Sequence, residues 1–411
     1  GFIFTEIVSY NFQVQLENCT IMYYFYPMFI KREIQKELTG LMQEYPVVTL
    51  TGPRQSGKTT LAKSTFPGFN YCNLEKPEIR TLAENDANAL LETFYPPVII
   101  DEIQRVPQLL SHIQSIVDEK KQNGLFLLTG SHQLTLNQEV TQTLAGRTAL
   151  LTLLPFTISE LSQYQINYDR DKQIYTGFLP RIYDQKQNPT KAYRNYLQTY
   201  IERDLRQLLK VKDLRVFENF LYLLAGRIGQ ITNLNSIVND LGVSSESLRH
   251  WLSILEASFI IFLLYPYYEN FGKRIIKSPK IYFTDPGLAA YLLGIENASQ
   301  VARDPLLGGL FENMVIMEAV KHRFNQGLDP YLYFFRDNHG NEVDLIYKKH
   351  NTLIPIEVKA AKTFNEHLTK GIHYMHKISP KAGKGYLLYA GELAFKTESY
   401  EVLNFTKNKK V

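Results

Sequence analysis

The 411-residue sequence predicts an α/β protein made of three successive units. Short apolar segments at 46–50, 69–74, 97–102, 124–131 and 149–154 alternate with helical segments, which is typical of a parallel sheet covered on both faces. From residue 190 the pattern becomes helical, and two strand-like segments follow it. After residue 306 a helix and a predicted hairpin indicate a further α/β unit. We therefore expect a parallel sheet, then a helical unit, then a second α/β unit.

The composition is that of a soluble globular chain, with 45% hydrophobic and 21% charged residues. The longest apolar runs, at 21–30 and 257–268, are shorter than the roughly 20 residues that span a bilayer, so we expect no membrane partner. Cys19 and Cys72 form no zinc or disulfide pattern, which favours a cytoplasmic location. A net charge of +4 is compatible with a nucleic-acid partner but does not establish one. Residues 1–27 lack the pattern of a signal peptide, and we interpret them as an N-terminal extension.

The segment between the first strand and the first helix of the sheet carries a phosphate-binding loop pattern: Gly52, four residues, then Gly57-Lys58-Thr59. Glycines let the chain curl so that several backbone N–H groups point at phosphate oxygens, and the following helix adds its positive dipole end. Lys58 can reach the β- and γ-phosphates of ATP, and the Thr59 hydroxyl can ligate Mg²⁺. The predicted ATP-binding residues are Gly52, Pro53, Arg54, Gln55, Ser56, Gly57, Lys58, Thr59 and Thr60.

Polar residues at the ends of later strands complete a hydrolytic site. Asp101 can hold Mg²⁺, and Glu102 can orient and deprotonate the attacking water; the alternative is that both only end a buried strand in solvent. Ser131 ends the next strand, where it can sense the γ-phosphate or cap a helix. Arg147 is a candidate for neutralising phosphate charge, in cis or across a contact in a homo-oligomer, and an ordinary surface arginine is the alternative.

The helical unit has the pattern of a winged helix. Helices at 216–228, 234–241 and 245–257 are separated by short turns, and strands at 259–265 and 280–284 follow. The loop at 272–280 contains four basic residues and no acidic one, namely Lys273, Arg274, Lys277 and Lys280. Such a loop can contact DNA phosphates, whereas Arg249 and His250 alone give little base-specific reading. The alternative is a structural linker that packs on the first unit.

The last unit contains a predicted hairpin of strands at 342–347 and 353–359, turning near residues 350–351. In that register Asp344 lies opposite Glu357, with Lys359 on the same face. The other face gathers six apolar residues: Val343, Leu345, Tyr347, Ile354, Ile356 and Val358. A helix at 310–324 adds Glu312 on an apolar stripe. Asp344, Glu357 and Glu312 are candidate ligands of Mg²⁺ or Mn²⁺, and Lys359 is a candidate catalytic residue; a cross-strand charge cluster is the alternative.

The order of these parts resembles the prokaryotic AAA-family ATPases that carry a winged helix and a C-terminal restriction-endonuclease-like domain of the PD-(D/E)XK type. The resemblance begins near Met28 and rests on short motifs, which include Gly-Pro-Arg-Gln-Ser-Gly-Lys-Thr-Thr-Leu at 52–61, Asp-Glu-Ile-Gln at 101–104, Leu-Thr-Gly-Ser at 128–131, Ala-Gly-Arg at 145–147, Leu-Pro-Phe at 154–156, Lys-Ser-Pro-Lys at 277–280, Phe-Glu-Asn at 311–313, Glu-Val-Asp at 342–344 and Ile-Glu-Val-Lys at 356–359. It implies an ATPase site at Lys58, Thr59, Asp101 and Glu102, and a nuclease triad of Asp344, Glu357 and Lys359 assisted by Glu312. A nuclease fold need not retain cutting activity.

We therefore expect an extension at 1–27, an AAA-type P-loop ATPase domain at 28–200, a winged-helix domain at 201–285 and a nuclease-like domain at 286–411. The expected function is Mg²⁺-dependent ATP hydrolysis coupled to DNA binding, with a metal-dependent nuclease site. The alternative is a nucleotide-gated switch whose C-terminal domain binds DNA or a protein partner without cleavage.

Overall fold

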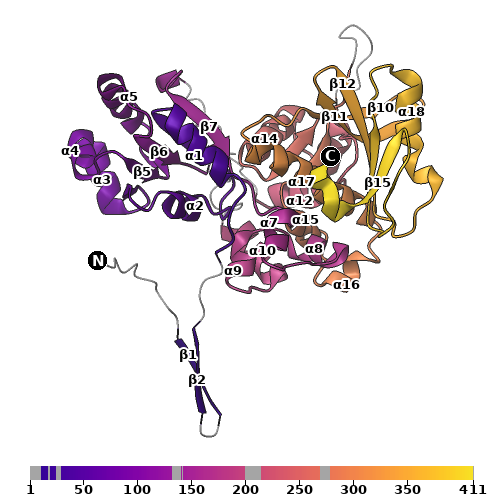
Figure 1. The fold of residues 1–411 in the computed structure, drawn as a ribbon, viewed down its shortest axis with the longest axis horizontal. Helices are drawn as coiled ribbons and strands as arrows, with labels where there is room; N and C mark the ends of the chain where they lie inside the picture. The colour runs from indigo at the N-terminus through magenta and orange to yellow at the C-terminus, as the bar shows by residue number, and fades with distance from the viewer. Residues whose placement is uncertain are drawn as a thin grey trace.

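The computed structural model describes residues 11–16, 19–24, 29–131, 140, 142–199, 214–268 and 278–410. Two strands near the N-terminus, β1 (Asn11–Leu16) and β2 (Cys19–Tyr24), pair antiparallel and stand away from the rest of the molecule (Figure 1). The remaining elements form two lobes. None of the helices in the described ranges combines the length and the apolar character that crossing a bilayer requires.

The first lobe contains a five-stranded sheet in which every strand is parallel to its neighbours, as the sequence predicts. The strand order is β4-β5-β6-β3-β7. Its strands are β3 (Val47–Thr51), β4 (Asn70–Asn73), β5 (Val98–Asp101), β6 (Phe126–Thr129) and β7 (Thr148–Thr152). Its helices are α1 (Gln35–Glu44), α2 (Lys58–Thr65), α3 (Pro77–Asn85), α4 (Ala87–Thr93) and α5 (Leu109–Lys120), with a 3₁₀ turn η1 at Ile103–Arg105.

The two faces of this sheet form separate cores because neighbouring residues of a strand point to opposite sides. Val47 packs with residues of α3, α4 and α5, whereas Val48 packs with residues of α1 and α2. The helical segment between β4 and β5 consists of two helices, since Asp86 ends α3 and caps α4 by accepting a hydrogen bond from the backbone of Ala89.

The second lobe begins with helices that pack together with the C-terminal part of the chain (Figure 1). These helices are α7 (Ile158–Gln163), α8 (Arg170–Thr176), α9 (Pro180–Asp184) and α10 (Pro189–Tyr196). They contribute to the core of the second lobe and not to the cores of the parallel sheet, so packing divides the chain near residue 154, whereas the sequence-based division lies at residue 200. Residues 200–213, which belong to the part of the sequence with a helical pattern, fall outside the described residues.

The elements predicted for a winged helix follow in the expected order: α12 (Leu214–Ala225), α13 (Leu234–Leu241), α14 (Ser245–Ala257), β8 (Ile261–Leu264) and β9 (Lys280–Phe283). Gly242 ends α13 with φ of 66°, a conformation that costs glycine little. Ser244 then caps α14 by accepting a hydrogen bond from the backbone of Ser247. β8 and β9 pair antiparallel, and Ile231 forms a further bridge with Lys280.

The C-terminal part contains a six-stranded mixed sheet in the order β10-β11-β12-β13-β15-β14. Its strands are β10 (Leu332–Arg336), β11 (Glu342–Lys349), β12 (Thr352–Lys359), β13 (Gly385–Tyr389), β14 (Phe395–Lys396) and β15 (Tyr400–Asn404). Its helices are α15 (Pro286–Leu292), α16 (Ala298–Val301), α17 (Leu307–Asn325) and α18 (Lys370–Ile378), with 3₁₀ segments η3 (Glu366–Thr369) and η4 (Phe405–Lys410). Side chains of α17 pack on one face and side chains of α18 on the other.

The β11–β12 hairpin has the predicted register, with Leu345 paired to Ile356 and Lys349 paired to Thr352. One assignment is wrong, however, because Val343 packs with Ile346 and Met375 and not with Leu345. The pairing of β11 with β10 shifts between Ile346 and Val343, and such a bulge inserts one residue and reverses the alternation of side chains beyond it.

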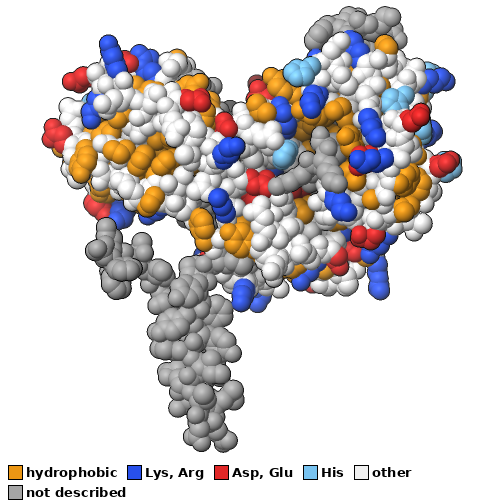
Figure 2. Space-filling view, viewed as in Figure 1, with side chains coloured by type: hydrophobic (Ala, Val, Ile, Leu, Met, Phe, Trp, Pro, Cys, Tyr) orange, Lys and Arg blue, Asp and Glu red, His pale blue; other side chains and the backbone are white. Residues whose placement is uncertain are grey.

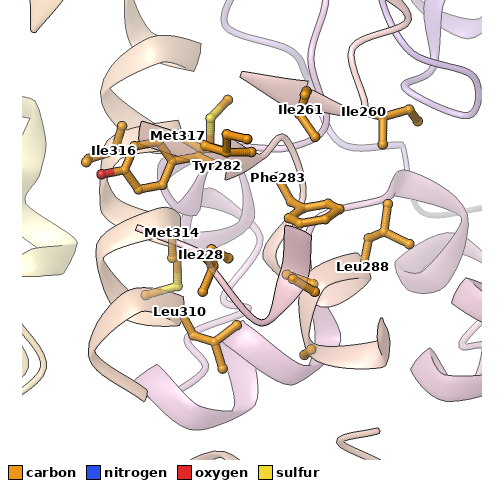
Figure 3. Close-up of a cluster of buried hydrophobic side chains, with 14 of the residues drawn as sticks. Ile228, Ile260, Ile261, Tyr282, Phe283, Leu288, Leu310, Met314, Ile316 and Met317 are labelled. Carbon is orange, nitrogen blue, oxygen red and sulfur yellow. The ribbon is translucent and has the colours of Figure 1, made fainter. Parts of the chain in front are cut away.

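A large shared core holds the second lobe together. Figure 3 shows part of it, with residues of α17, of the β8–β9 hairpin and of α15 in one cluster. Its labelled members are Ile228, Ile260, Ile261, Tyr282, Phe283, Leu288, Leu310, Met314, Ile316 and Met317. Between the two lobes the surface is hollowed (Figure 2), and a cleft of about 670 Å³ is lined by residues of β7, α14 and α17.

Candidate functional site

The predicted phosphate-binding loop connects β3 to α2, the context that the motif requires. Gly52 has φ of 144°, and a Cβ there would lie 2.1 Å from the carbonyl oxygen of Leu153. Gly57 precedes α2 with φ of 93°. Both positions therefore require glycine, and the loop can take this shape only with the spacing seen in the sequence.

The Lys58 side chain is buried inside this loop. Its Nζ donates hydrogen bonds to the carbonyl oxygens of Gly52, at 2.9 Å, and Pro53, at 2.8 Å. Burial lowers the pKa of Lys58 to about 8, and the carboxylates of Glu102 and Asp101 oppose this shift only in part. The ammonium group is therefore easily neutralised, and negative phosphate oxygens beside it would restore its charge.

This pKa predicts a pH dependence of ATP binding. Below pH 8 Lys58 is already protonated, so binding takes up no proton there. Above pH 8 Lys58 of the free protein loses this proton, whereas bound phosphates keep Lys58 protonated. ATP binding therefore takes up a proton in this range, and ATP affinity falls as pH rises. Calorimetry in buffers of different ionisation enthalpy at pH 8.5, a value chosen about half a unit above that pKa, measures the uptake. Lys58→Met should abolish it, and the exposed Lys63→Met should not; equal uptake in both variants would exclude Lys58 as the group.

Thr59 and Asp101 meet at the carboxyl edge of the parallel sheet. The Thr59 hydroxyl donates to Asp101 Oδ2 at 3.0 Å, and the Tyr71 hydroxyl donates to the same oxygen at 2.8 Å. Thr129 Oγ1 donates to Asp101 Oδ1. A hydroxyl beside a carboxylate suits Mg²⁺, so these residues fit the predicted ion. Sequence reasoning missed Tyr71 and Thr129, although both lie in strands that flank β5.

Glu102 and Ser131 lie together, as their positions at the ends of adjacent strands predict. Ser131 Oγ donates to Glu102 Oε2 at 3.1 Å, and the Gln104 side-chain amide donates both to this carboxylate and to Ser131 Oγ. Glu102 has φ of 59°, a left-handed conformation that costs a non-glycine residue about 1–3 kcal/mol and is found most often at functional sites. The structure thus orients the Glu102 carboxylate with two donors, one of which, Gln104, had no role in the prediction.

Arg147 lies at the opposite edge of the sheet from the phosphate-binding loop. Its carbonyl oxygen accepts from Val47 at the start of β3, and its Nε contacts Asp118 Oδ1 at 2.6 Å. The loop follows the far end of β3, about 16 Å away along a five-residue strand. The prediction that Arg147 acts in cis is therefore wrong, because parallel strands place residues before β3 and before β7 at the same amino edge. A role across a subunit contact, and the homo-oligomer that it needs, remain predictions.

A buried arginine that sequence reasoning missed supports the phosphate-binding loop. Arg32 donates to the carbonyl oxygens of Ser56, at 2.8 Å, and Leu154, at 2.6 Å, and its Nε contacts Glu160 Oε1 at 3.0 Å. The Arg32 and Glu160 side chains are only 5% and 0% exposed. Arg32 thus connects the loop to the segment that follows β7. No local pattern marks this residue, because Ser56, Leu154 and Glu160 lie 24, 122 and 128 residues away from it in the sequence.

Helix α17 holds the other side of that segment. Lys321 Nζ donates to the carbonyl oxygen of Phe156 at 2.8 Å and to Glu318 Oε1 at 2.8 Å. The other Glu318 oxygen accepts from the backbone of Ile158 at 2.8 Å, at the start of α7. Residues 154–158 are therefore fixed to the loop by Arg32 and to the C-terminal part by α17.

The residues predicted for a nuclease site also come together. Lys359 Nζ lies 2.5 Å from Asp344 Oδ2 and 2.6 Å from Glu357 Oε2. Asp344 Oδ2 accepts a further hydrogen bond from the backbone of Val358 at 2.8 Å. Burial, and next the neighbouring Asp344, raise the pKa of Glu357 well above its usual value. The hairpin register therefore gathers these three side chains as predicted.

Glu312 joins this group through a residue assigned elsewhere by the sequence analysis. Lys280 Nζ lies 2.9 Å from Glu312 Oε1 and 2.5 Å from Glu342 Oε1, and the Tyr282 hydroxyl donates to Glu312 at 2.6 Å. The prediction that Lys280 contacts DNA from an exposed loop is wrong, since the residue is 2% exposed. It belongs to β9, where alternate residues such as Lys280 and Tyr282 point to one side. Lys273, Arg274 and Lys277 lie outside the described residues.

The C-terminal cluster does not fit the predicted metal ion in this arrangement. Within the part of the chain that the structure describes, no three Asp, Glu, His or Cys side chains converge as metal ligands. The ammonium groups of Lys280 and Lys359 instead lie between the carboxylates that would have to share an ion. Each of the four carboxylates Glu312, Glu342, Asp344 and Glu357 thus already contacts a lysine ammonium, so none depends on a metal for a cation partner.

A comparison with known protein families agrees with the geometry of the first lobe. Residues 44–162 match the family model described as AAA domain, and residues 167–299 and 307–407 match two domains of unknown function, DUF8612 and DUF4143. The uncharacterized proteins Rv2008c of Mycobacterium tuberculosis and Mb2031c of Mycobacterium bovis are each 30% identical over 344 residues, covering 81% of this chain and 74% of theirs. The uncharacterized protein MJ1637 of Methanocaldococcus jannaschii is 24% identical, covering 87% and 83%. A solved structure, the Walker-type ATPase PABY2304 of Pyrococcus abyssi, is 14% identical with a TM-score of 0.44, covering 64% of this chain and 96% of its own.

Proposed function

Because the chain belongs to the family of the mycobacterial proteins Rv2008c and Mb2031c and carries an AAA domain, we propose that it hydrolyses ATP at its phosphate-binding loop. The observation that carries this proposal is the contact between Thr59 and Asp101 beside the oriented carboxylate of Glu102. These groups meet at the carboxyl edge of a parallel sheet, where ligands of such sheets bind.

The roles of the residues follow from their positions. The loop glycines and the start of α2 provide backbone N–H groups for the phosphates, and Lys58 contacts the β- and γ-phosphates. Thr59 and Asp101 would hold Mg²⁺, which neutralises charge on the phosphates when bound. Glu102 accepts the proton of the attacking water, and Ser131 and Gln104 keep its carboxylate in place.

Phosphate release by the purified chain with Mg²⁺ and ATP tests the proposal. Lys58→Ala should reduce hydrolysis by at least about 10²-fold and weaken ATP binding, because the buried ammonium is the cation nearest the phosphates. The exposed Lys36→Ala should hydrolyse ATP at the parental rate. Parental hydrolysis by Lys58→Ala would refute the proposed site.

A second candidate function is DNA binding with phosphodiester cleavage by the C-terminal part. The convergence of Asp344, Glu357 and Lys359 favours it, and the exposed Arg249 and His250 on α14 offer a contact for phosphates. Metal-dependent cleavage would require the ion pairs of Lys280 and Lys359 with these carboxylates to break. The alternative is therefore a nucleotide-gated switch whose C-terminal part binds DNA or a protein partner and does not cut.

Incubation with linear, branched and single-stranded DNA, with Mn²⁺ and with or without ATP, separates these alternatives. Cleavage that disappears in Asp344→Ala, persists in the exposed Glu398→Ala and leaves ATP hydrolysis intact would support a nuclease. DNA binding without cleavage, with an affinity that falls steeply with salt, would support the switch. If neither binding nor cleavage occurs, DNA is not the partner.

A further inference from the structure

The C-terminal cluster contains one lysine that comes from outside the mixed sheet. The cluster contains four carboxylates: Glu312 from α17, Glu342 and Asp344 from β11, and Glu357 from β12. Lys359 of β12 bridges the last two, whereas Lys280 of β9 bridges Glu312 and Glu342. One of the two cations is thus supplied by the β8–β9 hairpin.

Lys280 is held as a buried charge and not as a surface ion pair. Its side chain is 2% exposed, whereas those of its partners Glu312 and Glu342 are 14% and 26% exposed. Burial acts to lower the pKa of Lys280, but the carboxylates of Glu312, Asp344 and Glu342 together outweigh it and raise the pKa above its usual value. The lysine therefore stays protonated at neutral pH.

The hairpin is also attached to the mixed sheet through its backbone. Just after β8, the backbone of Tyr267 donates to the carbonyl oxygen of Phe334 at 2.7 Å, and Phe334 donates back to Tyr265 at 3.1 Å. Pro266 and Phe334 thus form a parallel bridge at the edge strand β10. The side-chain bridge of Lys280 and this backbone bridge lie on two different strands of the same sheet.

We propose that the Lys280 ammonium provides positive charge to Glu312 and Glu342 in place of a divalent metal. Through these contacts it attaches the β8–β9 hairpin to the C-terminal domain. A divalent metal shared by Glu312 and Glu342 would have to lie where the ammonium now lies, 2.9 Å and 2.5 Å from their oxygens. The docked hairpin and a metal shared by Glu312 and Glu342 therefore exclude each other. This inference goes beyond ATP hydrolysis and does not depend on it.

The first claim of the proposal is that Lys280 takes the place of a divalent metal. It is tested by measuring Mn²⁺ binding to the nucleotide-free full chain by electron paramagnetic resonance. An Asp101→Asn background removes the carboxylate assigned to Mg²⁺ in the ATPase site. In this background we expect no ion bound at millimolar Mn²⁺. An ion that is bound there and lost on adding Glu312→Gln or Glu342→Gln would overturn the inference.

Melting temperatures in the same Asp101→Asn background test the second claim, that Lys280 attaches the β8–β9 hairpin. Lys280→Met should melt several degrees lower, because two carboxylates lose their partner in a largely buried site, and Mn²⁺ should restore part of this loss. Lys280→Arg should keep most of the parental melting temperature without responding to Mn²⁺, and the exposed Lys348→Met should match the parent. Parental melting by Lys280→Met, or a loss that Mn²⁺ leaves unchanged, would overturn the proposal.

If Lys280→Met does not fold, Glu342→Gln tests the same bridge with a milder change, since Glu342 is 26% exposed. We expect its melting temperature to fall by a few degrees, and an unchanged value would contradict the fastening role. DNA cleavage is measured separately. A nuclease that works with Lys280 in place would refute this inference and leave ATP hydrolysis untouched, whereas failed ATP hydrolysis leaves the Mn²⁺ and melting results valid.

Discussion

Glu102→Gln should bind ATP with nearly parental affinity and hydrolyse it about 10²–10⁴-fold more slowly. The amide keeps the size of the carboxylate but cannot accept the proton of the attacking water. Asp101 and Thr59 are untouched, so the groups that hold Mg²⁺ and the phosphates remain in place. This effect is expected to be the largest of any single conservative substitution in the chain.

Nucleotide affinity by calorimetry and phosphate release under single-turnover conditions separate binding from chemistry. The exposed Glu78→Gln on α3 is the matched control and should behave like the parent. Ser131→Ala should slow hydrolysis by a smaller factor, since Ser131 positions the Glu102 carboxylate and does not itself accept the proton. Parental hydrolysis by Glu102→Gln would show that another group activates the water.

The site of the first lobe could be predicted because its determinants are local or follow from sheet topology. The spacing of Gly52 and Gly57 is dictated by a loop that tolerates no Cβ at Gly52. Asp101 and Ser131 end parallel strands, and the carboxyl ends of parallel strands meet at one edge. The same reasoning could have excluded Arg147 from this edge, because it precedes a strand and so lies at the other end of the sheet.

The C-terminal cluster was only partly predictable. The β11–β12 register follows from the position of the turn, which fixes the pair Leu345–Ile356 and so brings the adjacent residues Asp344 and Glu357 near each other. The bulge that turns Val343 to the other face is set by pairing with β10, a strand that the sequence analysis did not identify. The sequence analysis missed Lys280 as the partner of Glu312. It placed Lys280 in an exposed loop because of the neighbouring basic residues, whereas tertiary packing buries the side chain.

One helix contacts both candidate sites. Glu312 of α17 faces the C-terminal cluster, while Glu318 and Lys321 contact the segment that follows the last strand of the ATPase sheet. Nine residues separate Glu312 from Lys321, which is about 13 Å along an α-helix. A displacement of residues 154–158 would therefore move α17 directly, and Arg32 is the residue that fixes this segment to the phosphate-binding loop.

Arg32→Met should destabilise the protein by about 3–5 kcal/mol, the cost of removing one partner of a buried ion pair. Glu160 would remain buried without its cation, and the carbonyl oxygens of Ser56 and Leu154 would each lose a donor. We expect a melting temperature lower by several degrees and weaker ATP binding, because Ser56 belongs to the phosphate-binding loop. The exposed Lys36→Met is the matched control for loss of a cation in the same region.

A double substitution shows whether the unpaired charge or the lost donors cause this loss. In Arg32→Met with Glu160→Gln the buried charge is gone, and the single amide oxygen can still accept one of the two hydrogen bonds from the backbones of Glu33 and Thr157. The double variant should therefore be more stable than Arg32→Met alone, while its ATP affinity should stay low, since the donor to Ser56 is still missing. Recovery of ATP affinity in the double variant would mean that Arg32 acts on the loop only through Glu160. If Arg32→Met loses no stability, the buried ion pair makes no net contribution to the free energy of unfolding. Such a result is known for some buried ion pairs that are replaced by hydrophobic residues.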